Sequence, residues 1–177
     1  MPYTKQDSRT PFKPAIMGVL DGIPIMDNIA SLTRMSEKGR WFKAFVDLVF
    51  KGSTSEHPEK VEILKPFTDV IREQYRKTRH PGDLNYAISS VYWGLLGDYP
   101  RHPKADYALR VFCRGVLQSY LERMSDYYKD RMDEDFVIIT YGVIGDVISE
   151  TYLRKTIIFE NEKMQENGDI YKDGKLV

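Results

Sequence analysis

The chain has 177 residues, of which 42% are hydrophobic and 29% charged, and its 26 basic residues balance its 26 acidic ones. This composition is typical of one globular domain with its own hydrophobic core, and the balanced charge argues against a general nucleic-acid binder, which usually carries a basic excess. Cys113 is the only cysteine, so an intramolecular disulfide and a cysteine-based zinc site are excluded.

Prolines punctuate residues 1–34, so we expect an irregular N-terminal arm there, with one or two helical turns before Gly22. Further along, apolar residues recur at helical spacing in five segments. The segments are 36–51, 58–77, 83–96, 104–131 and 136–164. This pattern predicts an all-α fold: a bundle of five to six helices in a single domain over residues 1–177, with a helical body over 36–164 and a short C-terminal tail over 165–177.

The first two segments each have a broad apolar face. In 36–51 this face consists of Trp41, Phe42, Phe45, Val46, Val49 and Phe50. In 58–77 it consists of Ile63, Leu64, Phe67, Val70, Ile71 and Tyr75. Pro66 lies inside the second segment, where it removes a backbone donor, so we expect it to kink or split that helix.

The segment 83–96 is the one around which we expect the bundle to pack. Asp83 suits the N-cap because its carboxylate accepts hydrogen bonds from the first free amides, and Gly97 suits a left-handed C-cap. The apolar face of this segment consists of Leu84, Ala87, Ile88, Val91, Tyr92 and Leu95. All six are expected in the core.

Basic and aromatic residues gather around the start of this same helix. The candidate ligand-binding residues are Arg72, Arg76, Arg79, Asn85, Tyr86 and Trp93. A helix start favours a phosphate or carboxylate, arginines add positive charge, and an aromatic ring offers a surface for a base to stack on. The alternative interpretation is structural: Asn85 bonds the tail at Glu166–Tyr171 or a neighbouring loop, and the arginines form a solvated helix face.

Two pairs of carboxylates are spaced four residues apart, so each pair shares one helix face. They are Asp126 with Asp130 and Asp146 with Glu150. If the last two helices pack antiparallel, these four side chains converge on a magnesium ion, as in all-α nucleotide pyrophosphatases. The alternative, which we favour, is that they are solvated polar faces; the protein then has no metal, no cofactor and no catalytic residue.

The histidines and the cysteine receive structural interpretations. His57, His80 and His102 each precede a proline, which favours extended backbone in turns over a shared metal site. Cys113 lies on the apolar face of its helix, so we expect it in the core, not as an exposed nucleophile.

Tyrosine is abundant in this chain, with 12 Tyr and 2 Trp among the 177 residues. Tyrosine is favoured where one end of the side chain is buried and the other is wet, as at protein interfaces. The simplest such interface is that of a symmetric homo-oligomer, so we expect self-association.

Three motifs resemble those of a family of short proteins from phages and prokaryotes. They are the start Met1–Arg9, the central Gly82–Ile88 and the terminal Glu166–Tyr171, which correspond to the patterns MPYxKxxxR, GDLNYAI and ENGD[VI]Y. This chain is longer than the pattern, with the surplus between Arg9 and Gly82 and around 104–132. The family has no assigned reaction, so the resemblance implies only an accessory role in a phage or a prokaryote.

The cellular compartment is a further expectation. No apolar run of the secretory kind lies near the start, and no stretch reaches the roughly 18 apolar residues of a membrane span. We therefore expect a cytoplasmic protein that does not associate with membranes, located in the host cytoplasm if a phage encodes it.

Together these features predict a non-enzymatic phage or prophage accessory protein. It self-associates and binds a host protein or a small anionic, nucleotide-like ligand, and sequestering a defence signal is one version of that role. The alternative is a magnesium-dependent all-α nucleotide phosphohydrolase that uses the four carboxylates. A second alternative is a nucleic-acid accessory factor that acts through Arg72–Arg79. The sequence contains no Walker loop, GxSxG, HExxH or EF-hand motif, which shifts weight away from an enzyme.

Overall fold

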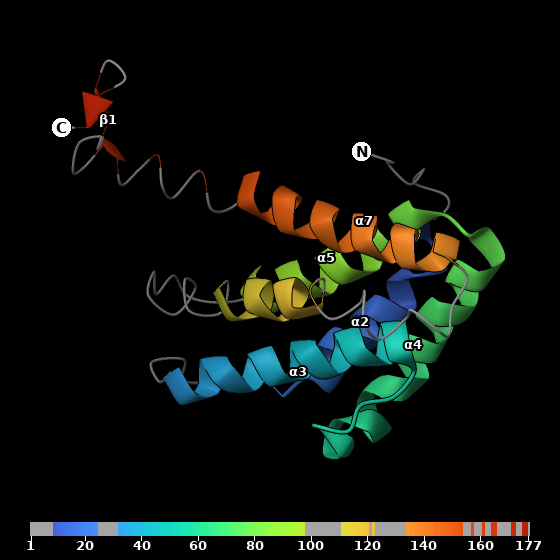
Figure 1. Ribbon diagram of the computed structural model, residues 1–177. Helices are drawn as coiled ribbons and strands as arrows, with labels where there is room; N and C mark the ends of the chain where they lie inside the picture. Colours follow the sequence, from blue (N-terminus) through green and yellow to red (C-terminus); the bar gives the residue numbers. More distant parts are fainter. Residues whose placement is uncertain are drawn as a thin grey trace.

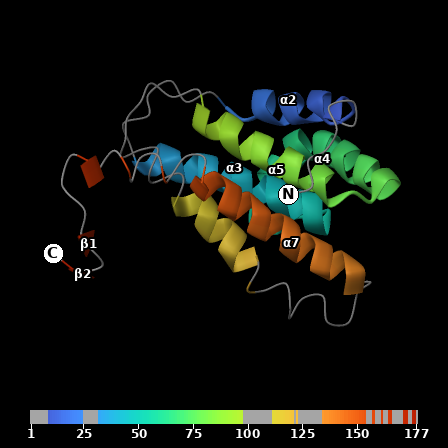
Figure 2. The same ribbon diagram turned by 90° about the horizontal axis from the view of Figure 1, so that it is seen from above.

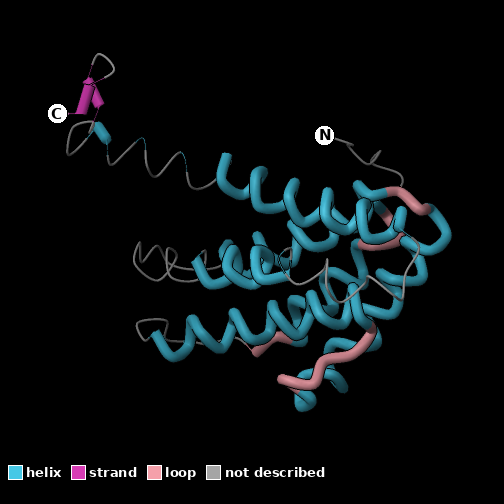
Figure 3. Tube along the Cα trace, in the orientation of Figure 1, coloured by secondary structure: helices cyan, strands magenta, loops and turns pink. Residues whose placement is uncertain are grey.

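The computed structural model describes residues 9–24, 32–97, 111–120, 122 and 134–153, and the positions 157, 161, 164, 165, 171, 172, 175 and 176. The described residues form the helices labelled in Figure 1, which are α2 (Lys13–Gly22), α3 (Leu32–Lys51), α4 (Pro58–Thr78), α5 (Pro81–Gly97) and α7 (Glu134–Thr151). Residues 111–120 form a further helical segment. Figures 1 and 3 show these helices stacked as a bundle, which confirms the predicted all-α fold.

α5 is the central helix of the bundle. It packs against α2, α3, α4 and α7, and Figure 2 shows it lying between α2 and α7. All six apolar side chains predicted for its inner face are at most 2% exposed, which confirms that prediction. Its small residues let neighbouring helices approach closely: a Cβ on Gly94 would lie 2.6 Å from a Leu20 methyl carbon of α2.

α3 joins α5 to the segment 111–120 through aromatic contacts. Phe42 of α3 lies 5.5 Å from Tyr92 of α5, measured between ring centroids, and Phe50 lies 5.4 Å from Tyr120. Every residue from Ala44 to Phe50 is buried, including the polar Asp47. The apolar face predicted for this helix is therefore confirmed in full.

α4 runs unbroken through Pro66, so the predicted split is wrong. Pro58 stands in the first turn, where a missing N–H costs nothing and a fixed φ favours a helix start. Beside the internal proline, the Thr68 hydroxyl donates to the Lys65 carbonyl at 3.1 Å. The carbonyl that loses its helical donor to the proline is that of Glu62, one turn earlier, so the Thr68 bond is a local bond of the helix and does not replace the missing one.

The predicted core face of α4 is correct only in part. Leu64, Ile71 and Tyr75 are buried, but Ile63 and Val70 are 41% and 42% exposed. The buried residues of α4 lie on one arc that neighbouring helices cover, and Ile63 and Val70 lie at the edge of that arc; Ile63 approaches α2 at Gly22 without being covered by it.

The N-terminal arm contains a regular helix, α2, that is longer than the one or two turns predicted. Its inner side chains Phe12, Ile16 and Val19 are buried against α4 and α5. At the other end of the chain, β1 (Tyr171–Lys172) pairs antiparallel with β2 (Lys175–Leu176). This hairpin lies apart from the helices in Figures 1 and 2. Within the described ranges, none of the helices has the long apolar stretch that a membrane crossing requires.

Candidate functional site

The junction between α4 and α5 is only two residues long. The first, Arg79, adopts a left-handed conformation with φ of 52° and ψ of 23°, and its N–H donates to the Tyr75 carbonyl at 2.8 Å. This closes α4 as a glycine C-cap would, but with a side chain present that normally avoids positive φ. The strain places an exposed guanidinium beside the start of the next helix.

His80, not Asp83, takes the cap position of α5, so the predicted N-cap is wrong. The helix begins at Pro81, the Gly82 N–H donates to His80 Nδ1 at 3.2 Å, and the Asp83 N–H donates to the His80 carbonyl at 3.0 Å. Proline is the preferred residue for the first helical position, which draws the start two residues upstream. The amides that we expected to hold an anion therefore already have a partner within the chain.

Asp83 is buried in the first turn of α5. Its side chain is 1% exposed, and neither carboxylate oxygen has a hydrogen-bond partner in the described part of the protein. A buried polar group without a partner costs free energy, and more so if it is charged. Such a group is therefore a candidate for function, where a ligand would supply the missing donor.

Tyr75 and Arg79 lie within electrostatic reach of this carboxylate. Burial raises the pKa of the Tyr75 hydroxyl above its ordinary value of 10.0; the Arg79 charge lowers this pKa, and the negative charge of Asp83 raises it further. The end of α4 carries additional positive charge in Arg76 and Lys77, both in its last turn. The junction thus combines a buried carboxylate with an exposed basic rim.

Three of the predicted ligand-binding residues lie on α5. The Asn85 side-chain oxygen accepts a hydrogen bond from the Ser89 hydroxyl at 3.1 Å, one turn later. The Tyr86 ring lies 5.3 Å from the Arg9 guanidinium, a cation–π contact to the N-terminal arm. Trp93 is half-buried and packs against the core. Asn85 and Tyr86 therefore adjoin Asp83 in sequence, whereas Trp93 lies two turns further along the helix.

The predicted arginines of α4 are divided between two places. Arg72 turns to α3, where its Nη1 donates to the carbonyls of Leu48 at 2.9 Å and Val49 at 3.0 Å. Arg76 is exposed and lies 3.7 Å from a Glu73 oxygen. Arg72 thus closes the C-terminal end of α3, and only Arg76 and Arg79 belong to the α4–α5 junction. The ligand-binding role of all six residues stays a prediction.

The alternative magnesium site rests on four carboxylates, two of which, Asp126 and Asp130, lie outside the described residues. Asp146 is half-buried and Glu150 buried on α7, one turn apart as the spacing predicts. Among the residues whose structure is described, no three His, Cys, Asp or Glu side chains gather closely enough to hold a metal ion.

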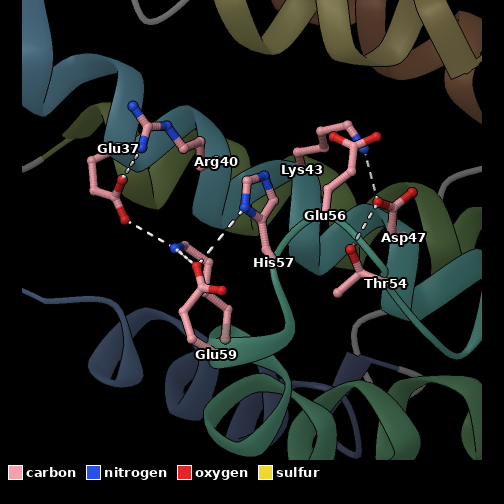
Figure 4. Close-up of polar contacts among 9 residues, drawn as sticks. Glu37, Arg40, Lys43, Asp47, Thr54, Glu56, His57 and Glu59 are labelled. Carbon is pink, nitrogen blue, oxygen red and sulfur yellow. Dashed lines mark hydrogen bonds and ion pairs between the residues drawn. The ribbon is translucent and has the colours of Figure 1, made fainter.

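A charged network along α3 was missed by our sequence reasoning (Figure 4). Asp47 is buried, and its two oxygens lie 2.9 Å from Lys43 Nζ and 3.0 Å from Lys51 Nζ. Thr54, in the α3–α4 connection, donates to the same carboxylate at 3.3 Å, and Glu56 lies 3.2 Å from Lys43. Burial lowers the pKa of Lys43, but its bonds to Asp47 and Glu56 raise it, and the net direction is upward.

The second part of this network surrounds Lys60. Its ammonium is buried 5.0 Å from the Trp41 ring centre and pairs with Glu37 at 3.0 Å and with Glu59. Burial lowers the pKa of Lys60 and the hydrogen bonds to Glu59 and Glu37 raise it, with a net upward shift. These charges pair with one another, and Asp47 Oδ1, which has no hydrogen bond in the described part of the chain, still lies 3.0 Å from the Lys51 ammonium. The network holds α3 to the start of α4, and the Asp83 carboxylate, which has neither kind of partner there, is the better candidate site. Comparison with protein-family models, curated proteins and solved structures gave no match.

Proposed function

We propose that this protein is a non-enzymatic accessory protein that self-associates and binds a small anionic, nucleotide-like ligand at the α4–α5 junction. The observation that carries the proposal is the buried Asp83 carboxylate without a hydrogen-bond partner in the described part of the chain. A nucleotide supplies what the junction lacks: N–H donors on its base for the carboxylate, and a phosphate for the exposed Arg79 and the last turn of α4.

The resemblance to short phage and prokaryotic proteins supports the accessory role, and sequestering a nucleotide signal in a host cell is the version we favour. The abundance of tyrosine supports self-association. Light scattering after size-exclusion chromatography tests this part directly. A self-associating protein elutes with a mass above the 20.6 kDa of one chain.

Calorimetric titration with purine mononucleotides, cyclic nucleotides and inorganic phosphate tests the ligand. We expect at least one nucleotide to bind, and Asp83→Asn to weaken its binding by about tenfold or more, because the amide lacks the charge and replaces one of the two acceptor oxygens by an NH2 donor. Arg79→Gln should weaken both nucleotide and phosphate. Lys65→Gln is the matched control, because Lys65 is exposed and forms its ion pair with Asp69, one turn along α4.

The stability of the same variants separates function from folding. Asp83→Asn removes a buried charge, so its free energy of unfolding should equal or exceed that of the wild-type protein. A panel in which nothing binds at about 1 mM, or an Asp83→Asn variant that binds like the wild type, contradicts the proposed ligand site.

A further inference from the structure

One face of α4 has the residue spacing of a helix that packs against another helix. Its residues follow one another at intervals of four and three: Glu59, Ile63, Pro66, Val70, Glu73 and Lys77. We call this set the α4 stripe. Alternating intervals of four and three keep side chains on one face of a helix over several turns, as in antiparallel and parallel coiled coils. The three middle residues are apolar and exposed to solvent.

The two ends of the α4 stripe carry opposite charges. The Glu59 side chain at one end is 61% exposed, and the Lys77 side chain at the other end is 62% exposed. Glu59 contacts Lys60, but Lys60 has Glu37 as a second partner, so the Glu59 carboxylate is not required to neutralise it. In Figure 1, α4 (green) runs along the outer, right-hand edge of the bundle, so both ends are accessible.

α2, which packs beside α4, also has an exposed apolar residue between two residues of opposite charge. A Cβ on Gly18 would overlap the Phe67 ring, and a Cβ on Gly22 would lie 2.8 Å from an Ile63 methyl carbon. Residue numbers therefore rise along α2 as they fall along α4, which means that the two helices run antiparallel. This antiparallel register puts Met17, which is 48% exposed, level with Thr68.

The charges of α2 follow from the same register. Asp21 lies level with Leu64, towards the acidic end of the α4 stripe, and Lys13 lies level with Arg72, towards its basic end. Both side chains belong to exposed residues. The face made by the α4 stripe and Met17 therefore carries Glu59 and Asp21 at one end, apolar residues in the middle, and Lys77 and Lys13 at the other end, where Glu73 lies 3.6 Å from Lys77 and offsets part of its charge.

We propose that a second copy of this chain docks on this face in antiparallel orientation, an inference that names the surface for the self-association proposed above and rests on it. Thr68 is midway between Glu59 and Lys77, and Met17 is midway between Lys13 and Asp21. Because Thr68 and Met17 are level, one twofold axis at that level pairs all these charges with their opposites on the partner. The same axis places Pro66 against Val70 of the other copy, so apolar residues meet at the centre.

Sedimentation equilibrium of two charge-reversal variants tests this arrangement. Alone, Glu59→Lys and Lys77→Glu each bring like charges together twice across the axis, so each should raise the dissociation constant of the dimer by about tenfold or more. Mixed in equal amounts, the two variants should form a heterodimer with near wild-type affinity, since every charge then faces its opposite.

Further variants keep the test independent of any folding defect. Lys13→Glu and Asp21→Lys repeat the experiment on α2, away from the Lys60 network. Val70→Asp should abolish association, whereas Val111→Asp, a control on an exposed residue of the segment 111–120, should leave it unchanged. Circular dichroism verifies that each variant is folded.

The outcomes are distinct. A wild-type protein that is monomeric at about 100 μM overturns both self-association and this surface, and leaves the face to another partner. A dimer that tolerates Val70→Asp and the reversals overturns this surface alone. If the reversals weaken the dimer but their mixture does not restore it, the antiparallel twofold arrangement is wrong.

Discussion

Phe67 of α4 occupies the space into which a side chain on Gly18 of α2 would project. The two helices approach closely here because one residue has no Cβ and the other fills the gap with a flat ring. The same contact sets the register from which the pairing of α2 and α4 residues was derived. It is therefore a contact on which both the fold and the proposed dimer surface depend.

Gly18→Ala should destabilise the protein by about 1–2 kcal/mol. The added methyl group overlaps a half-buried ring, which costs roughly 1–3 kcal/mol, and the higher helix propensity of alanine offsets only part of that. Denaturant unfolding monitored by circular dichroism measures the difference. Gly115→Ala is the control: no atom of the described residues lies within 4 Å of its Cβ position, so alanine should stabilise the helical segment by about 0.5–1 kcal/mol. Equal effects of both variants would show that Phe67 moves aside freely.

Arg72→Met should cost about 1.5–3 kcal/mol of stability. The methionine keeps the apolar stem but removes the guanidinium that binds the Leu48 and Val49 carbonyls, and hydrogen bonds from charged groups contribute about that much. Urea unfolding of Arg72→Met and of the exposed control Arg76→Met decides the question, since the control should change stability by less than about 0.5 kcal/mol. A stable Arg72→Met variant that loses ligand binding would instead restore the ligand role predicted from sequence.

The helical periods in the sequence predicted the all-α fold and the buried faces of α3 and α5, because both helices are covered by neighbours over their whole apolar arc. The same reasoning failed for Ile63 and Val70. A periodic apolar face predicts that a helix has an apolar surface. It does not predict whether another helix of the same chain or another molecule covers that surface.

The sequence predicted where the candidate site lies in the chain, but it did not predict which groups at the site are buried, capped or paired. Sequence spacing located the start of α5 and the arginines before it. It could not show that His80 caps the helix and that Asp83 is buried, because both depend on a two-residue difference in the helix start. Nor could it show that Arg72 binds α3, since the Leu48 and Val49 carbonyls lie more than 20 residues away in sequence.

The stability of the protein should fall at alkaline pH. The pKa of Lys60 is higher in the folded protein than its ordinary 10.5, so its ion pairs stabilise the fold fully below about pH 10.5, and this contribution is lost as pH rises through the folded-state pKa. Buried Tyr75 acts in the same direction: its pKa is raised above 10.0, so above that pH the unfolded state, which ionises first, is favoured.

Denaturant unfolding between about pH 8 and pH 11.5 measures this loss. Lys60→Met should flatten the alkaline decline, whatever its effect at neutral pH, and Tyr75→Phe should flatten it separately. Lys65→Met is the matched control, because that ammonium is exposed and forms its ion pair with the exposed Asp69. A decline of the same slope in Lys60→Met as in the wild type would mean that Lys60 titrates alike in both states.

Cys113 should resist thiol reagents in the native protein. Its side chain is fully buried in the segment 111–120, which confirms the predicted core position, and burial raises the pKa of the thiol well above its ordinary 9.0. Reaction needs an exposed thiolate, so it must wait for this segment to open, and the rate measures how often it does. We expect labelling by an aromatic disulfide at pH 8 to be slower than in denaturant by on the order of 100-fold or more. A rate near that of the denatured chain would show that the segment detaches readily from α3, and the contact between Phe50 and Tyr120 would then contribute little to holding it.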